Sequence, residues 1–138
     1  MPIASKAASS AIQLKRAYAP VAKGDGTRIL VDRLWPRGIR KTDAAIDRWL
    51  KDIAPSTALR QWFGHRPDRW PEFRRRYRAE LRQRPELVAE IRNAARAGPV
   101  TLVYGARDEV HNEAVVLRDL LSRKSASRRD RSAARRPD

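Results

Sequence analysis

The chain has 138 residues, no cysteine and a formal net charge of +15. This length fits one domain with one core, and the lack of cysteine excludes disulfides, cysteine-ligated metals and cysteine nucleophiles. No apolar run approaches the roughly 20 residues that cross a bilayer, and residues 1–10 lack the apolar segment of a secretory signal. We therefore expect a cytoplasmic protein with no membrane partner.

In chain order, residues 1–10 are expected to be a disordered lead-in. Apolar and polar residues alternate over 12–18, which predicts a first strand near a sheet edge. Residues 28–34 form the second predicted strand, and their continuous apolar run, Ile29–Val31, is typical of a strand covered on both faces. Pro36 ends pairing there.

Apolar residues at helical spacing predict four helices before the next strand. These helices begin at Thr42, Ser56, about Asp68 and Pro85, and the first of them runs to Ile53. Residues 99–104 form the last predicted strand, and a last helix is expected from about Asp108 to Leu121.

This order predicts an α/β fold, a small Rossmann-like domain with a mainly parallel, few-stranded sheet flanked by helices. The domain is expected to span residues 11–122. Residues 123–138 contain seven basic and two acidic side chains and no apolar periodicity, so they are expected to form a disordered basic tail.

Two strand-to-turn junctions carry most of the candidate functional side chains. If the second and last strands are parallel neighbours, both junctions lie at the carboxyl edge of the sheet, where open α/β sheets bind ligands. A tryptophan and an arginine exposed on a rigid turn have little folding value, which favours a functional role for the first junction. The candidates are Arg33, Trp35, Arg37 and Gly38 from the first junction, and Tyr104, Asp108, His111 and Asn112 from the second.

These residue types indicate a site for a small anionic ligand. Arginines bind phosphate or carboxylate through paired N–H groups, and the start of a helix also favours an anion. We therefore expect an enzyme-like domain that binds a phosphate-bearing or nucleotide-like ligand, with Asp108 and His111 as the acid/base pair. No signature of a metal or cofactor site occurs, so none is predicted.

Other interpretations remain open. Asp108 could simply cap a helix, and Asp32 and Arg33 could form structural ion pairs. The arginines between positions 69 and 82 could be a solvated face or a contact for nucleic acid. The alternative function is therefore a nucleic-acid-binding or regulatory module without catalytic activity, with non-specific contacts made by the basic tail.

Several motifs occur along the chain in a specific order: Val31–Gly38, Trp49, Ala54–Ser56, Leu59–Arg60, Trp62–Phe63, the Trp70/Phe73/Tyr77 helix with Glu80–Leu81, Thr101–Tyr104 and His111–Asn112. Together these segments resemble the YeaO-like family, within the wider family called domain of unknown function 488. The resemblance covers about residues 12–121. It implies a small Rossmann-like domain in the bacterial cytoplasm, with a site around the Trp35–Gly38 turn and the last strand-helix junction, and it implies no particular reaction.

Overall fold

A computed structural model describes residues 12–122, and its four strands form one parallel sheet in the order β1-β4-β2-β3. The strands are β1 (Ile12–Arg16), β2 (Thr27–Leu30), β3 (Arg48–Trp49) and β4 (Val100–Tyr104). The predicted α/β class, the edge position of the first strand and the pairing of the second strand with the last are confirmed. The expected lead-in and basic tail lie outside the described residues.

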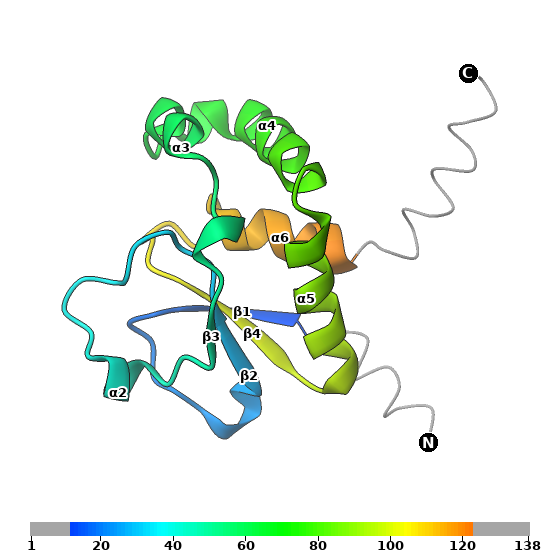
Figure 1. Cartoon of the computed structure of the whole chain (residues 1–138). Coiled ribbons are helices and arrows are strands. Elements are labelled where there is room, and N and C mark those ends of the chain that lie inside the picture. The colour runs from blue at the N-terminus through cyan, green and yellow to red at the C-terminus, as the bar shows by residue number, and fades with distance from the viewer. Residues whose placement is uncertain (1–11, 123–138) are drawn as a thin grey trace.

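Helices cover one face of the sheet in two tiers. Figure 1 shows α6 between the sheet and α4, and α6 packs on β1 and β4. The helices are α2 (Lys41–Ala44), α3 (Thr57–Phe63), α4 (Trp70–Arg82), α5 (Pro85–Ala97) and α6 (Glu113–Ser122), with short 3-10 helices η1 (Lys23–Asp25), η2 (Lys51–Ile53) and η3 (Pro67–Arg69). Within residues 12–122, none of these helices has the length and apolar character needed to cross a membrane.

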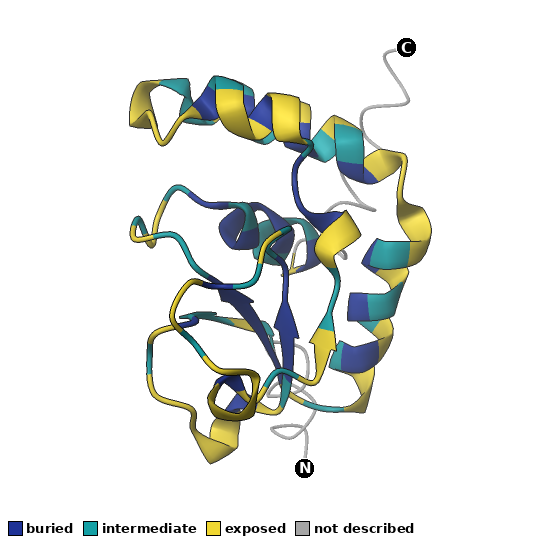
Figure 2. Cartoon of the chain, turned by 60° about the vertical axis from the view of Figure 1, so that its left-hand side comes forward, coloured by how far each residue is buried: buried dark blue, intermediate teal, exposed yellow. Residues whose placement is uncertain are grey.

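The central strands are buried on both faces, as the continuous apolar run predicts (Figure 2). Ile29 and Val31 belong to the large core beneath the helices, and Leu30 points into a second cluster on the opposite face. That second cluster is covered by a loop rather than by helices, and Trp35 and Trp49 pack there against Leu30 and Val103. The central strands are thus covered on both faces, by helices on one and by this loop on the other.

The prediction of a helix from Thr42 to Ile53 is wrong. Only α2 forms, because Ala45 adopts a left-handed conformation with φ 51°. The chain then adds Arg48 and Trp49 to the sheet as the short edge strand β3, paired with β2. The apolar residues of this segment do bury against the protein, but tertiary pairing overrides their helical spacing.

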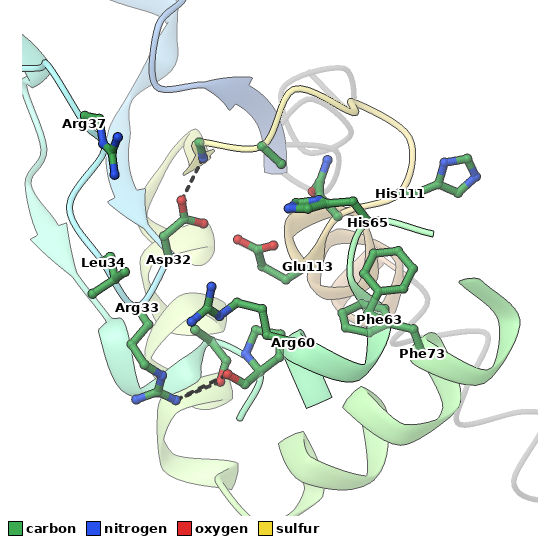
Figure 3. Close-up of a pocket in the computed structure, with 15 residues that line it drawn as sticks. Asp32, Arg33, Leu34, Arg37, Arg60, Phe63, His65, Phe73, His111 and Glu113 are labelled. Carbon is green, nitrogen blue, oxygen red and sulfur yellow. Dashed lines mark hydrogen bonds between the residues drawn. The ribbon is translucent and has the colours of Figure 1, made fainter. Parts of the chain in front are cut away.

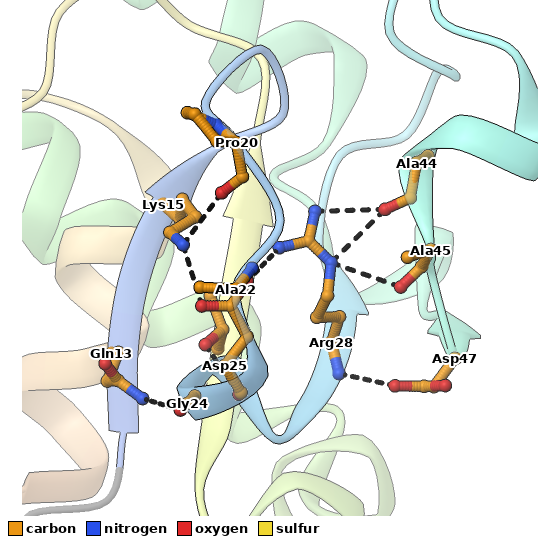
Figure 4. A network of polar contacts seen from close by, with 11 residues as sticks. Gln13, Lys15, Pro20, Ala22, Gly24, Asp25, Arg28, Ala44, Ala45 and Asp47 are labelled. Carbon is orange, nitrogen blue, oxygen red and sulfur yellow. Dashed lines mark hydrogen bonds and ion pairs between the residues drawn. The ribbon is translucent and has the colours of Figure 1, made fainter.

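A buried polar network joins the start of β2 to the end of α2 and the loop that follows it (Figure 4). Arg28 forms an ion pair with Asp25 at 2.6 Å, and its guanidinium also donates to the carbonyl groups of Ala44 and Ala45. Burial would raise the pKa of the Asp25 carboxyl, but hydrogen bonds from Lys15, the Ala22 N–H and Arg28 outweigh it and lower the pKa. The network stops α2 and places the loop over the sheet.

The last helix begins five residues later than expected, at Glu113 rather than Asp108. Asn112 is its cap, because the side-chain Oδ1 accepts the Val115 N–H at 3.1 Å. Asp108 instead accepts the N–H groups of Val110 and His111, each at 2.9 Å, and so closes a turn before the helix. Aspartate and asparagine both cap helices well. Here Asn112 caps the helix, and Asp108 closes the turn before it.

Candidate functional site

A cavity of about 520 Å³ opens at the carboxyl ends of β2 and β4 (Figure 3). Its wall is built by the segments that follow β2 and β4, by the Ala54–Pro55 turn, and by side chains of α3, α4 and α6. The two junctions predicted from the sequence therefore meet. Cavities of this size and position are where α/β proteins bind small molecules.

Asp32 joins the two junctions directly. It follows β2, and its Oδ2 accepts the backbone N–H of Gly105, the residue after β4, at 2.8 Å. A side chain at position 105 would crowd this contact, since a Cβ would lie 3.0 Å from Asp32 Oδ2. The Asp32 carbonyl also accepts the indole N–H of Trp49 at 2.8 Å. No arginine pairs with Asp32 within the described residues, so its interpretation as half of a structural ion pair is wrong.

Glu113 faces Asp32 across the cavity. Both carboxyl groups point into it, one from the end of β2 and one from the first residue of α6 (Figure 3). Burial raises the pKa of the Glu113 carboxyl well above its usual range, and a hydrogen bond with Asp32 and the charge of that carboxylate raise it further. Arg60 opposes the shift but does not cancel it. Glu113 thus tends to keep its proton and to share it with Asp32 through that hydrogen bond.

Three arginines line the cavity, and they differ in whether their guanidinium groups bond to other residues of the protein. Arg33 is tied to its wall, because Nη2 donates to the carbonyl groups of Ala54 and Pro55 at 3.3 and 3.4 Å. Its guanidinium also lies 3.8 Å from an Asp52 oxygen. Arg37 and Arg60 are exposed, and neither guanidinium forms a hydrogen bond or an ion pair with another described residue. These two arginines are therefore the ones available to an anion.

Of the first-junction candidates, Arg33 and Arg37 line the cavity, whereas Trp35 and Gly38 do not. The Trp35 indole packs edge-on against Trp49, with ring centroids 5.5 Å apart, and donates to the Ile39 carbonyl at 2.7 Å. Gly38 supplies a positive φ of 80° to the turn. The expectation that Trp35 has little folding value is wrong, because Trp35 packs on the second face of the sheet.

Of the second-junction candidates, His111 and Asn112 line the cavity, whereas Tyr104 and Asp108 do not. His111 Nδ1 lies 2.8 Å from Asp108 Oδ2, and this contact lowers the pKa of Asp108 to about 2. The His111 ring meets Trp70 edge-on, with centroids 5.2 Å apart, and points away from Glu113 in Figure 3. Tyr104 is buried in the core and hydrogen bonds with Asn112, so these residues hold the loop together.

Sequence reasoning missed Arg60, His65 and Glu113, which all line the cavity. Glu113 directly follows the His111–Asn112 motif, and the helix start placed too early hid its position at the front of α6. Arg60 lies within a motif of the family resemblance, and only the packing of α3 shows where it faces. Among residues 12–122, no three His, Cys, Asp or Glu side chains gather to hold a metal ion.

The raised pKa of Glu113 predicts how the stability of the chain changes with pH. Its folded-state pKa lies above the reference value of 4.5, so its contribution to stability is present below that pH and is lost as the pH rises towards the folded-state value. Glu113→Gln keeps a hydrogen-bond donor and cannot ionise. We expect its Tm to match the parent chain below the reference pKa and to exceed it increasingly at higher pH, by about 4 °C for each kcal/mol. Thermal melts across this pH range measure the difference.

Glu109→Gln is the matched control, because Glu109 is exposed in the loop before α6. It should leave the Tm within about 2 °C at every pH, as surface substitutions change stability by about 0.5 kcal/mol or less. A Glu113→Gln chain that melts lower than the parent above neutral pH would contradict the proton-sharing interpretation of the pair.

Comparison with known proteins identifies relatives over nearly the whole chain. Residues 11–137 match a family described as "Inactive DUF488-N3 subclade". The chain is 48% identical over 110 residues to the uncharacterized protein YeaO of Escherichia coli, covering 80% of this chain and 96% of that protein. It is 42% identical over 111 residues to the uncharacterized protein Rv3073c of Mycobacterium tuberculosis, covering 80% and 93%. No solved structure matches the chain.

Proposed function

This chain belongs to the DUF488 family, among its YeaO-like members, and from that premise we propose that it is an enzyme-like cytoplasmic domain that binds a small phosphate-bearing or nucleotide-like ligand. One observation carries the proposal: the cavity at the carboxyl ends of β2 and β4 combines free arginines with a carboxyl pair. Such a combination suits a ligand that has both an anionic group and hydrogen-bonding groups.

The free arginines support the anionic part of the proposal. Arg37 comes from the loop after β2 and Arg60 comes from α3, so the cavity offers a guanidinium from each of two walls to the anionic group of a ligand. The α3 wall is also held in place, because Ser56 caps α3 and bonds Glu80 of α4 through both its N–H and its hydroxyl. A wall fixed in this way keeps the Arg60 backbone in one position before a ligand arrives.

The apolar part of the lining supports a ligand that is more than an inorganic anion. Phe63 and Phe73 form part of the wall, and Leu34 lines it while its side chain stays 66% exposed. An exposed leucine beside a cavity offers a surface to the apolar or planar part of a ligand, such as a base.

The description of the matched subclade as inactive favours binding over turnover. The predicted catalytic pair also loses support, because Asp108 and His111 bond each other and Asp108 lies off the cavity. The groups with acid/base character in the cavity are instead Asp32 and Glu113. We therefore propose ligand binding as the function, with these two carboxyl groups as the polar contacts at its centre.

Thermal stabilisation by a ligand panel tests the proposal. Nucleoside monophosphates or phosphorylated sugars should raise the Tm in a saturable way, because a ligand at about 100 times its Kd stabilises by about 2.7 kcal/mol. Arg60→Ala should remove most of this shift while leaving the unliganded Tm nearly unchanged, since the exposed Arg60 side chain forms no hydrogen bond or ion pair with another described residue. Differential scanning fluorimetry gives both quantities.

Arg96→Ala is the control, because Arg96 lies near the end of α5, just before the amino end of β4, and among residues 12–122 its side chain bonds only the exposed Asn93. It should retain the full ligand shift. The competing function, nucleic-acid binding through the basic tail or α4, predicts instead an affinity that falls steeply with salt and is lost when residues 123–138 are deleted. A panel with no saturable shift, together with salt-sensitive binding of RNA or DNA, would replace our proposal with that alternative.

A further inference from the structure

The charges that line the cavity suggest which part of a ligand lies where. Arg37 is exposed and lies apart from the carboxyl pair, whereas Asp32 and Glu113 are less exposed and face each other, with Arg60 beside Glu113 (Figure 3). Asp32 is held by the Gly105 N–H, so its carboxylate cannot turn away from the cavity without losing that bond. A phosphate placed at the carboxyl pair would meet negative charge, whereas at the arginines it would meet positive charge.

We propose that the Asp32–Glu113 pair is the subsite for the hydroxyl groups of a phosphorylated sugar, such as the vicinal hydroxyls of a ribose phosphate. The inference rests on the proposed function and adds to it the chemical class of the ligand and its orientation. The sugar lies at the carboxyl pair, and the phosphate lies on the exposed side of the cavity, towards Arg37.

The hydrogen-bonding capacity of the pair favours hydroxyl groups. A hydroxyl both donates and accepts, and the protonated Glu113 carboxyl can donate beside the acceptor oxygens of Asp32, which it faces. Two neighbouring hydroxyls can therefore satisfy both carboxyl groups without adding or removing a proton. A second anion would be repelled, and an apolar group would leave the carboxyl groups unsatisfied.

The geometry of the backbone also suits this subsite. Gly105 leaves open the space beside Asp32 that a side chain would occupy, and the Glu113 carboxyl comes from the first residue of α6, fixed by the Asn112 cap. Contacts within the protein thus hold Asp32 itself and the backbone start of α6 that carries Glu113. Fixed polar groups discriminate between ligands because a missing partner leaves them unpaired.

The test compares four probes by calorimetry or thermal shift: inorganic phosphate, ribose 5-phosphate, AMP, and the AMP analogue that lacks both the 2′- and 3′-hydroxyls. We expect ribose 5-phosphate and AMP to bind on the order of tenfold or more tightly than the dideoxy analogue and inorganic phosphate. Asp32→Asn should abolish this preference and retain the binding of inorganic phosphate, while Arg60→Ala should weaken all four probes. Glu113→Gln, which keeps a donor, should retain part of the preference, and melting curves establish that each variant is folded.

The outcomes separate the two proposals. If AMP and its dideoxy analogue both bind and do so equally, or if Asp32→Asn leaves their ratio unchanged, the hydroxyl subsite is wrong while phosphate binding stands. If none of the four probes binds the parent chain, both the subsite and the proposed function fail. If ribose 5-phosphate binds and AMP does not, the subsite holds and the ligand is a phosphorylated sugar rather than a nucleotide.

Discussion

Replacing Arg28 by alanine should lower the free energy of unfolding by about 3 kcal/mol, at the lower end of the range for breaking a buried ion pair. Arg28 is 2% exposed and Asp25 is 3% exposed, and their contact of 2.6 Å is largely shielded from water. Asp25 would keep Lys15 as a partner at 2.7 Å, which limits the loss. The carbonyl groups of Ala44 and Ala45 would lose their shared donor, so that the loop covering the second face would loosen. Urea denaturation at neutral pH measures the change.

Arg48→Ala is the matched control for Arg28→Ala. Arg48 pairs with Glu90 at 3.4 Å, but the two side chains are 46% and 38% exposed. A surface pair of this kind contributes about 0–1 kcal/mol, so this variant should be nearly as stable as the parent chain. Similar losses for both variants would show that the Asp25–Arg28 network does not hold the loop.

Gly26→Ala should cost about 4 kcal/mol or more, from backbone strain and overpacking together. Gly26 has φ 65° and ψ −139°, a region that residues with a side chain rarely adopt. A Cβ there would overlap the Pro99 carbonyl oxygen and lie 2.6 Å from its carbon. That carbonyl accepts the Thr27 N–H at 2.9 Å, so it cannot move away without weakening the start of the β2–β4 pairing. Denaturant unfolding, or loss of soluble protein, reports the effect.

Gly24→Ala, two residues away, is the control for Gly26→Ala. No heavy atom lies within 4 Å of a Cβ at position 24, and Gly24 does not have a positive φ. Its substitution should change the free energy of unfolding by about 0.5 kcal/mol or less. If Gly26→Ala were tolerated as well as Gly24→Ala, the close approach of this turn to Pro99 would be wrong.

The candidate site could be predicted from the sequence only in part. The meeting of two junctions followed from one inference, that the second and last strands are parallel neighbours, and Arg33, Arg37, His111 and Asn112 do line the cavity. Trp35 has residue chemistry that suits a binding role equally well, yet it packs on the other face. Residue type and order place a side chain at an edge of the sheet, but they do not decide towards which face it turns.

Local signals in the chain determined the elements that depend on short-range chemistry. The apolar run Ile29–Val31 predicted a doubly buried strand, Ser56 predicted the start of α3, and Pro85 predicted the start of α5. Each of these outcomes depends on neighbouring residues: a run that can face two layers, a hydroxyl that caps, or a ring that fits the first turn of a helix.

The tertiary structure alone decided the outcomes that depend on distant residues. The 42–53 segment ends its helix after one turn because Arg28, far back in the chain, takes the carbonyl groups of Ala44 and Ala45. Glu113 acquired its raised pKa because the fold buries its carboxyl group and brings Asp32 beside it. Contacts between residues that are far apart in the chain leave no periodic pattern in the sequence. For that reason, only the folded structure shows the carboxyl pair at the centre of the proposed site.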